Sequence, residues 1–297
     1  MTMRKSGLSV LIPTYNHCCV SLVKQLVVLL QAADIDYEII VTDDGSTDTD
    51  TIVENQAISQ QPHCRFITRE QNSGSAATRN FLATQSQYDQ LLFIDCDVTI
   101  PNNDFIQRYL ATEDLCVVNG GICITTDARW EGNLRYRYEK QAEMAHAVIR
   151  RQQNPYKEFR STNFMIKYET FMDCRFDERF KRSGYEDVFF GKQLKQRAIP
   201  VNHIDNPVMM NTFEDNPAFL RKTEQNLRTL HAFRNDLRGY SKLLTLADGI
   251  HLSVVRWLIC RFHALFNKIE RRILCSAQPS LTVFKIYRLG YFLSLRS

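Results

Sequence analysis

The sequence predicts an α/β domain with a mostly parallel sheet over residues 1–215, followed by a helical extension over residues 216–297. In the first hundred residues, short apolar runs alternate with segments whose apolar residues recur at helical spacing, which is the pattern of βαβ units. Polar motifs directly follow the short runs, where ligands bind in open α/β sheets. From about residue 218 onward only helical periodicity remains.

The first four strands are short apolar runs separated by helical segments. We expect these strands at 8–12, 37–42, 64–68 and 91–94. The stretches 20–33 and 73–84 carry an apolar stripe and predict helices. Another helix is expected after the second strand, where Ser46 or Thr47 can cap it and acidic residues would lie in its first turn.

Beyond Pro101 the pattern is less regular. The expected strands are a pair within 117–124 and single strands at 161–167 and 199–204, and the expected helices are 131–152 and 186–198. Asn-Pro pairs at 206–207 and 216–217 interrupt the chain, so we expect the domain boundary near 213–217.

Composition excludes several classes of protein. With 44% hydrophobic and 24% charged residues the chain can bury a core, and no run of eighteen apolar residues predicts a membrane-spanning helix. The apolar stretch at the N-terminus breaks at Pro13 without a cleavage site, so no signal peptide is predicted. The nine cysteines contain no CxxC pair, which argues against a zinc site or a disulfide framework and favours the reducing cytoplasm. No nucleic-acid-binding motif is visible.

Two pairs of acids follow two of the expected strands. In LLFIDCDVTI, residues 91–100, the acids are Asp95 and Asp97. Residues i and i+2 of a strand point to one side, and Mg²⁺ and Mn²⁺ are bound by one or two carboxylates together with substrate phosphates. In VTDDGS, Asp43 or Asp44 could accept a hydrogen bond from a nucleobase ring N–H, although Asp-Gly is also a frequent turn pair.

Two further motifs lie at the starts of expected helices. In NSGSAATRN, Gly74 allows close backbone approach, and a helix N-terminus favours phosphate. Arg79 adds a permanent charge that could reach a phosphate, hold the acid pairs apart or form a structural salt bridge. In SGYEDVFFG, Glu186 and Asp187 either complement the helix dipole or supply a general base at the rim of a cleft.

Together with PTYN at 13–16, these motifs resemble the family 2 glycosyltransferases of the GT-A fold, in the same order and over roughly residues 7–215. The resemblance implies an inverting enzyme of bacterial type that moves a sugar from a nucleotide-diphosphate sugar, with a UDP-sugar favoured, to a hydroxyl of a glycan or lipid-linked acceptor. It implies a role in surface polysaccharide biosynthesis and Mn²⁺ or Mg²⁺ as the cofactor.

The resemblance also assigns roles to single residues. Nucleotide and donor sugar would be bound by Thr14, Tyr15, Asn16, Asp43, Asp44, Gly74, Arg79 and Asp95. Asp44 would read the base. Asp187 would be the catalytic base, and Glu186 would contact the acceptor or the donor sugar. The acceptor side would include Asn163 and Trp130.

The metal would be bound by Asp97, with Asp95 beside it. Related sequences often place a His near the end of this domain, where Met209 and Met210 stand here. A thioether is a poor ligand for a hard ion. The nearby His203 is expected to be structural. We therefore expect a weakly held cation with Asp97 as its main protein ligand.

Other nucleotide-binding enzymes fit less well. A dinucleotide-dependent oxidoreductase would show GxGxxG after the first strand, and a P-loop kinase would show a longer glycine-rich motif around Gly191-Lys192. A degenerate transferase that only binds a sugar nucleotide or a partner stays open as an alternative, because of the missing His.

The last segment is strongly basic. From Ile250 to the C-terminus there are eight Lys or Arg residues and one acid, Glu270, among many bulky apolar residues. This pattern predicts amphipathic helices at an anionic membrane surface, on the inner face of the cytoplasmic membrane. The alternative is packing on the catalytic domain or on a second copy of the chain, and the sequence leaves the oligomeric state open.

Overall fold

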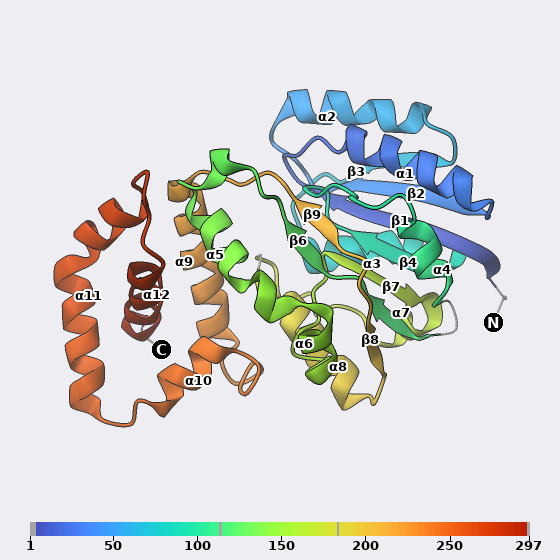
Figure 1. Cartoon of the computed structure of the whole chain (residues 1–297). Helices are drawn as coiled ribbons and strands as arrows, with labels where there is room; N and C mark the ends of the chain where they lie inside the picture. Colours follow the sequence, from blue (N-terminus) through green and yellow to red (C-terminus); the bar gives the residue numbers. More distant parts are fainter. Residues whose placement is uncertain (1–3, 113–114, 183, 296–297) are drawn as a thin grey trace. The chain divides into compact units, whose positions relative to one another are not determined.

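The computed structural model describes residues 4–112, 115–182 and 184–295 and forms two compact units (Figure 1). The first unit contains Met1–Cys123, Ala145–Lys181 and Glu186–Asn211. The second contains Ile124–Met144, Arg182–Tyr185 and Thr212–Ser297. The predicted division of the sequence at 215/216 stays a prediction, and the second unit takes two earlier segments in addition to the C-terminal part.

A seven-stranded sheet forms the centre of the first unit, with the strand order β3-β2-β1-β4-β7-β5-β8. Its strands are β1 (Lys5–Thr14), β2 (Tyr37–Asp43), β3 (Cys64–Thr68), β4 (Tyr88–Ile94), β5 (Val117–Asn119), β7 (Asn163–Lys167) and β8 (Val201–His203). β1 to β4 are parallel, β7 is antiparallel to β4 and β5, and β8 is parallel to β5. The short strands β6 (Ile122–Ile124) and β9 (Val208–Met210) form a separate pair.

Helices cover both faces of this sheet, which is why β2 is buried along its whole length. They are α1 (Val20–Ala33), α2 (Thr49–Asn55), α3 (Ser75–Gln85), α4 (Phe105–Leu110), α6 (Val148–Gln153), α7 (Tyr168–Asp173) and α8 (Glu186–Gln196). α3, α7 and α8 share one core, in which the rings of Phe93 and Phe164 stack at 4.8 Å. Figure 1 shows α1 on the other side of the sheet from α7.

The predicted cap of α2 is wrong. Asp48 caps this helix, and its carboxylate accepts hydrogen bonds from the N–H groups of Asp50 and Thr51. The hydroxyl of Ser46 is engaged elsewhere, because it accepts from Asn16 N–H and donates to Asp43. A long-range contact therefore decides which of the polar residues before the helix becomes its cap.

The predicted helix over 131–152 is broken into α5 (Leu134–Glu143), a 3₁₀ turn (Met144–His146) and α6. Ala147 interrupts the helical path with an extended ψ of 147°. Beyond the break, the buried guanidinium of Arg151 donates to the carbonyl oxygens of Asn119, Gly120 and Ile204. Helical periodicity continues through this break and gives no sign of it, and the partners that fix Arg151 in α6 lie far away in the sequence.

The second unit is mainly helical, as predicted for the chain beyond residue 218. Its helices are α5, α9 (Asn216–Ala232), α10 (Lys242–Gly249), α11 (Ser253–Leu274) and α12 (Leu281–Ser294). Its core is formed by Leu134, Phe219, Leu220, Leu274, Phe284 and Tyr287. Over residues 4–112, 115–182 and 184–295, no helix combines the length and the apolar character needed to cross a bilayer.

Candidate active site

The predicted motifs of the first unit meet where the parallel strands of the sheet have their carboxyl ends, which we call the site edge of the sheet. Thr14 and Asp43 are the last residues of β1 and β2, and Asp95 directly follows β4. β7 runs in the opposite direction, so its first residue, Asn163, pairs with the end of β4. The N–H of Asp95 donates to the carbonyl of Thr162 at 3.0 Å. The parallel order of β1, β2 and β4 thus gathers these polar groups at the carboxyl ends of the strands.

The tip of β1 is held against the start of α2. Asn16, at a positive φ of 49°, accepts hydrogen bonds on Oδ1 from the N–H groups of Thr47 and Asp48. Thr14 is buried and donates its hydroxyl to the carbonyl of His17. Tyr15 is 44% exposed and Asn16 is exposed beside it, so the second half of the PTYN motif is open to a ligand.

Asp44 ties the end of β2 to the start of α3. Its buried carboxylate accepts from the N–H groups of Ser73 and Gly74, the latter at 2.8 Å, and from Arg69 Nη1 at 3.1 Å. Asp43 is bonded to Ser46. The base-reading role of Asp44 stays a prediction, and a nucleobase would have to share this carboxylate with three protein donors.

Gly74 is required by the packing of the chain on itself. It has a φ of 90°, in the region that favours glycine, and a Cβ at this position would lie 2.4 Å from the carbonyl oxygen of Lys181. The close approach expected of Gly74 is therefore observed, but toward the loop before α8. This contact places the start of α3 beside the start of α8.

Arg79 joins the acids of two motifs. Its side chain on α3 is buried, Nη2 donates to Asp95 Oδ1 at 2.6 Å, and Nη1 lies 3.6 Å from Glu186 Oε1. Burial disfavours the charge on Arg79, but the carboxylates of Asp95 and Glu186 outweigh burial and raise its pKa. The structure thus shows Arg79 as a buried cation between two acids.

The acids at the start of α8 differ in their surroundings. Glu186 is buried and accepts a 2.7 Å hydrogen bond from the hydroxyl of Ser75. Asp187 is partly exposed, and Oδ1 accepts from the N–H of Val188. Desolvation and then the charge of Glu186 raise the pKa of Asp187 to about 6, against the opposing charge of Arg160. A carboxylate with a raised pKa is suited to take up a proton near neutral pH.

The acids of the DCD motif lie in a turn and not in a strand. β4 ends at Ile94, so the expectation that strand alternation points both carboxylates to one side is wrong. Asp95 is committed to Arg79, and Asp97 is partly exposed. Within the described part of the chain, no group of three or more His, Cys, Asp or Glu side chains could hold a metal ion. These residues fit an ion that is shared with substrate phosphates, which needs only one or two protein carboxylates.

Met209 and His203 are the residues of this part of the sequence that bear on the metal site. Met209 on β9 exchanges two backbone hydrogen bonds with Thr99, two residues after Asp97, so a thioether residue lies in this neighbourhood. His203 is buried, and its ring nitrogens contact Arg151 and the carbonyl of Pro155. Burial lowers its pKa to about 4. The structural role predicted for His203 is confirmed.

The two predicted acceptor-side residues lie in different units. Asn163 is buried at the start of β7, where its side-chain amide bonds to the hydroxyl of Tyr109 and to two backbone carbonyls. Trp130 belongs to the second unit, where its ring packs edge-on against Phe213. The acceptor-side roles of both residues stay predictions.

Sequence reasoning missed three polar residues that shape this edge. Ser75 binds Glu186, Arg69 binds Asp44, and Arg160 acts on the pKa of Asp187. Ser75 lies within the NSGSAATRN motif, but nothing in the motif marks it as a partner of Glu186. No motif marks Arg69 or Arg160, because each meets its acid through the fold and not through sequence spacing.

Comparisons with known proteins show a family match and related sequences. The model of glycosyl transferase family 2 matches residues 9–189. A hyaluronan synthase of Pasteurella multocida is 24% identical over 221 residues, which are 63% of this chain and 22% of that protein. A chondroitin synthase of Escherichia coli is 25% identical over 134 residues, which are 44% of this chain and 19% of that protein. The chain thus spans about a fifth of the length of these relatives.

The fold also matches solved structures. A mannosyltransferase from Pyrobaculum calidifontis, solved with GDP-Man and Mn²⁺, superposes with a TM-score of 0.53 at 14% identity, over 97% of this chain and 88% of the other. At this identity the likeness concerns the fold alone. The predicted GT-A type of α/β fold, with a mostly parallel sheet flanked by helices and a helical C-terminal part, is confirmed.

Proposed function

The chain belongs to glycosyl transferase family 2, and we propose that it moves a sugar from a nucleotide-diphosphate sugar to a hydroxyl of a glycan or lipid-linked acceptor. The observation that carries the proposal is the connection of Asp95, Arg79 and Glu186 across three motifs, with Asp187 beside them. Arg79 thus connects Asp95, proposed for donor binding, to the helix start that carries the candidate base Asp187.

The proposed reaction is a single displacement that inverts the anomeric centre. The ionised carboxylate of Asp187 takes the proton of the acceptor hydroxyl while the hydroxyl oxygen bonds to the anomeric carbon of the donor sugar. The bond from that carbon to the diphosphate oxygen breaks, and the electron pair leaves with the nucleoside diphosphate. The reacting carbon has oxocarbenium character, as in glycoside hydrolysis. Glu186, held by Ser75 and Arg79, lies next in the chain and is proposed to contact a sugar.

The donor base and pathway are part of the proposal. Uridine is favoured by the family resemblance, and the relatives named as hyaluronan and chondroitin synthases support synthesis of a polysaccharide. All nine cysteines are free thiols, which supports a reducing compartment such as the cytoplasm.

A divalent cation is proposed as the cofactor, bound by Asp97 together with the donor diphosphate. When bound, it would supply positive charge to the leaving diphosphate. The solved mannosyltransferase with GDP-Man and Mn²⁺ supports this choice of ion. Asp95 would help indirectly, because Arg79 fixes its position.

We expect Asp97→Asn to remove the effect of Mn²⁺ on the binding of a nucleoside diphosphate. Wild-type protein should bind the diphosphate at least about tenfold more tightly with Mn²⁺ than with a chelator. Without the cation, the negative charges of Asp97 and of the diphosphate are no longer neutralised by a shared ion. In the variant the two affinities should be equal by calorimetry. Asp104→Asn, an exposed acid in a surface ion pair, is the matched control. An unchanged Mn²⁺ effect in Asp97→Asn would place the ion elsewhere.

Release of nucleoside diphosphate from a panel of sugar nucleotides tests the proposed function, with and without Mn²⁺ and acceptor oligosaccharides. We expect at least one donor to be turned over. Binding of a donor without turnover of any, with every acceptor tried, would favour the alternative of a protein that only binds sugar nucleotides.

A further inference from the structure

Most of the exposed large apolar side chains described for the second unit lie on α11. Six large side chains along this helix are each at least 37% exposed: Val254, Leu258, Phe262, Leu265, Ile269 and Ile273. At about 100° per residue they fall within one sector of the helix about 100° wide, which we call the apolar stripe. With 22 residues, α11 is about 33 Å long, and the stripe runs over most of that length.

A row of positive charges borders the apolar stripe. Arg261, Lys268 and Arg272 are exposed and occupy the adjoining sector of α11, on one side of the stripe. We call these three residues the basic row. Trp257, 59% exposed, lies just beyond the basic row, and the guanidinium of Arg261 is 6.0 Å from its ring.

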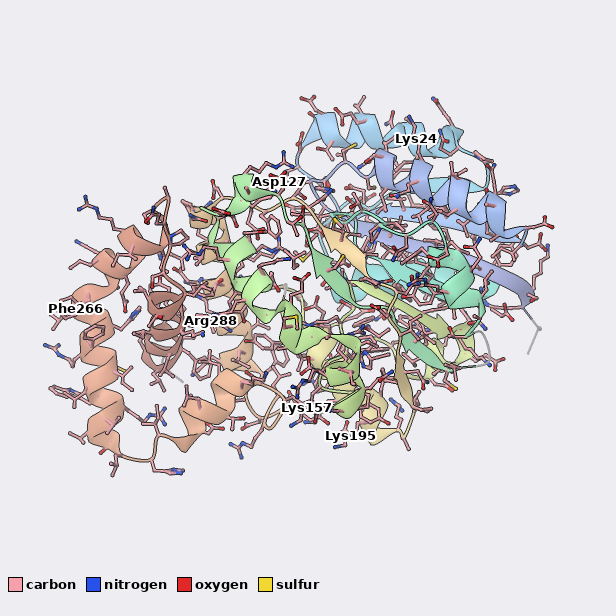
Figure 2. The ribbon with its side chains drawn as sticks, in the orientation of Figure 1. Lys24, Asp127, Lys157, Lys195, Phe266 and Arg288 are labelled. Carbon is pink, nitrogen blue, oxygen red and sulfur yellow. The ribbon has the colours of Figure 1, made fainter. Side chains whose placement is uncertain are left out.

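The opposite side of α11 faces the core of the second unit. Its buried residues are His263, Glu270 and Leu274, and α12 packs along the helix (Figure 1). Glu270, the only acid of the helix, is bonded to His263 Nδ1 at 2.8 Å. Within α11, all of which the structure describes, no negative charge is exposed beside the stripe or the basic row. Figure 2 marks Phe266, a further exposed aromatic residue of this helix.

We propose that the apolar stripe and the basic row of α11 bind the surface of an anionic lipid bilayer. A helix of this kind lies in the plane of the interface, with its apolar side chains among the acyl chains and its cations at anionic headgroups. The aromatic ring of Trp257 would lie at headgroup level, where tryptophan is enriched. The proposal goes beyond the proposed function and does not depend on transferase activity.

Charge complementarity favours a bilayer over a second copy of the chain. In an antiparallel pair of α11 helices packed stripe to stripe, the two basic rows would lie on the same side and repel each other. In a parallel pair, each basic row would meet no acid of the partner helix, because none is exposed on it. An anionic membrane surface satisfies the stripe and the row together.

The test is flotation of the full-length protein with vesicles of phosphatidylcholine alone and of phosphatidylcholine with phosphatidylglycerol. We expect binding to the anionic vesicles that weakens with salt, and a blue shift of tryptophan emission that Trp257→Phe removes. Leu258→Gln with Leu265→Gln should weaken binding about tenfold or more. Replacing the three residues of the basic row by Gln should weaken binding to the anionic vesicles by a similar factor.

Val28→Gln with Val53→Gln is the matched control, because these side chains are 64% and 63% exposed on the first unit. The control should bind like wild type. Absence of vesicle binding, or equal binding by all variants, would overturn the proposal. So would a concentration-dependent dimer, seen by light scattering, that the double leucine variant abolishes while no vesicles are bound. The basic-row variant keeps the test decisive if the leucine variant does not fold, since its three changes are all at exposed positions.

Discussion

Asp187→Asn is expected to lower the turnover number about 10²–10⁴-fold while the affinity for the donor changes little, because only general-base catalysis is lost. Asn keeps the shape of the side chain but cannot take the acceptor proton. Turnover should be measured by nucleoside diphosphate release, and donor affinity by calorimetry. Asp173→Asn, an exposed acid at the end of α7, should leave both quantities unchanged. A loss of donor affinity as large as the loss of turnover would count against Asp187 as the base.

The pH dependence follows from the raised pKa of Asp187. Activity should fall about tenfold per pH unit below about pH 6, where this carboxylate becomes protonated. The free energy of unfolding changes with pH in the opposite direction. Because the pKa of Asp187 is higher in the folded protein than in the unfolded chain, its ionised form lowers the free energy of unfolding at neutral pH. This loss disappears below about pH 4, where Asp187 is protonated in both states. Asp187→Asn should therefore melt at a higher temperature than wild type at pH 7.5. The difference should shrink as the pH falls toward 4.

Local sequence patterns predicted the helices and strands whose buried faces show in the spacing of their own apolar residues. The helical spacing of apolar residues over 20–33 corresponds to α1 at the same residues, and the apolar run at 64–68 is β3. These segments bury one face or both faces against a continuous core, so their burial pattern is written in adjacent residues. The order of the motifs along the chain also indicated the family: PTYN, VTDDGS and DCD each lie at the end of one of the parallel strands β1, β2 and β4, and the Glu-Asp pair follows later at the start of α8.

Long-range contacts could not be predicted in the same way. The expected long helix ends before α6, where Arg151 bonds to carbonyls on other segments. Asp48 caps α2, while the Ser46 hydroxyl is bonded to Asn16 and Asp43. In the site, the hydrogen bond from Ser75 to Glu186 joins residues 111 positions apart. Such partners are decided by three-dimensional packing, and sequence spacing carries no signal of them. The motifs therefore indicated which residues meet in the candidate site, but not the bonds between them.

Arg79→Met is expected to lower the free energy of unfolding by about 3–5 kcal/mol, because it leaves the carboxylates of Asp95 and Glu186 without their buried cation. Arg79→Lys should recover part of this loss, since it keeps the charge but cannot reproduce the two-sided contact of the guanidinium. The measurement is the urea midpoint at constant slope. Arg179→Met, which removes an exposed ion pair with Asp177, should change stability by no more than about 0.5 kcal/mol.

Two further readouts separate this positioning role from direct phosphate binding by Arg79. The guanidinium helps to keep the pKa of Asp187 from rising further, so its loss should move the acidic limb of the activity profile to higher pH. In addition, Asp95→Asn should cost less stability in the Arg79→Met background than in wild type, because the ion pair is already broken. If Arg79 instead contacted the donor, its replacement would weaken diphosphate binding while stability, the pH profile and the coupling to Asp95 stayed unchanged. The contacts of the buried Arg79 guanidinium with Asp95 at 2.6 Å and with Glu186 at 3.6 Å favour the positioning role.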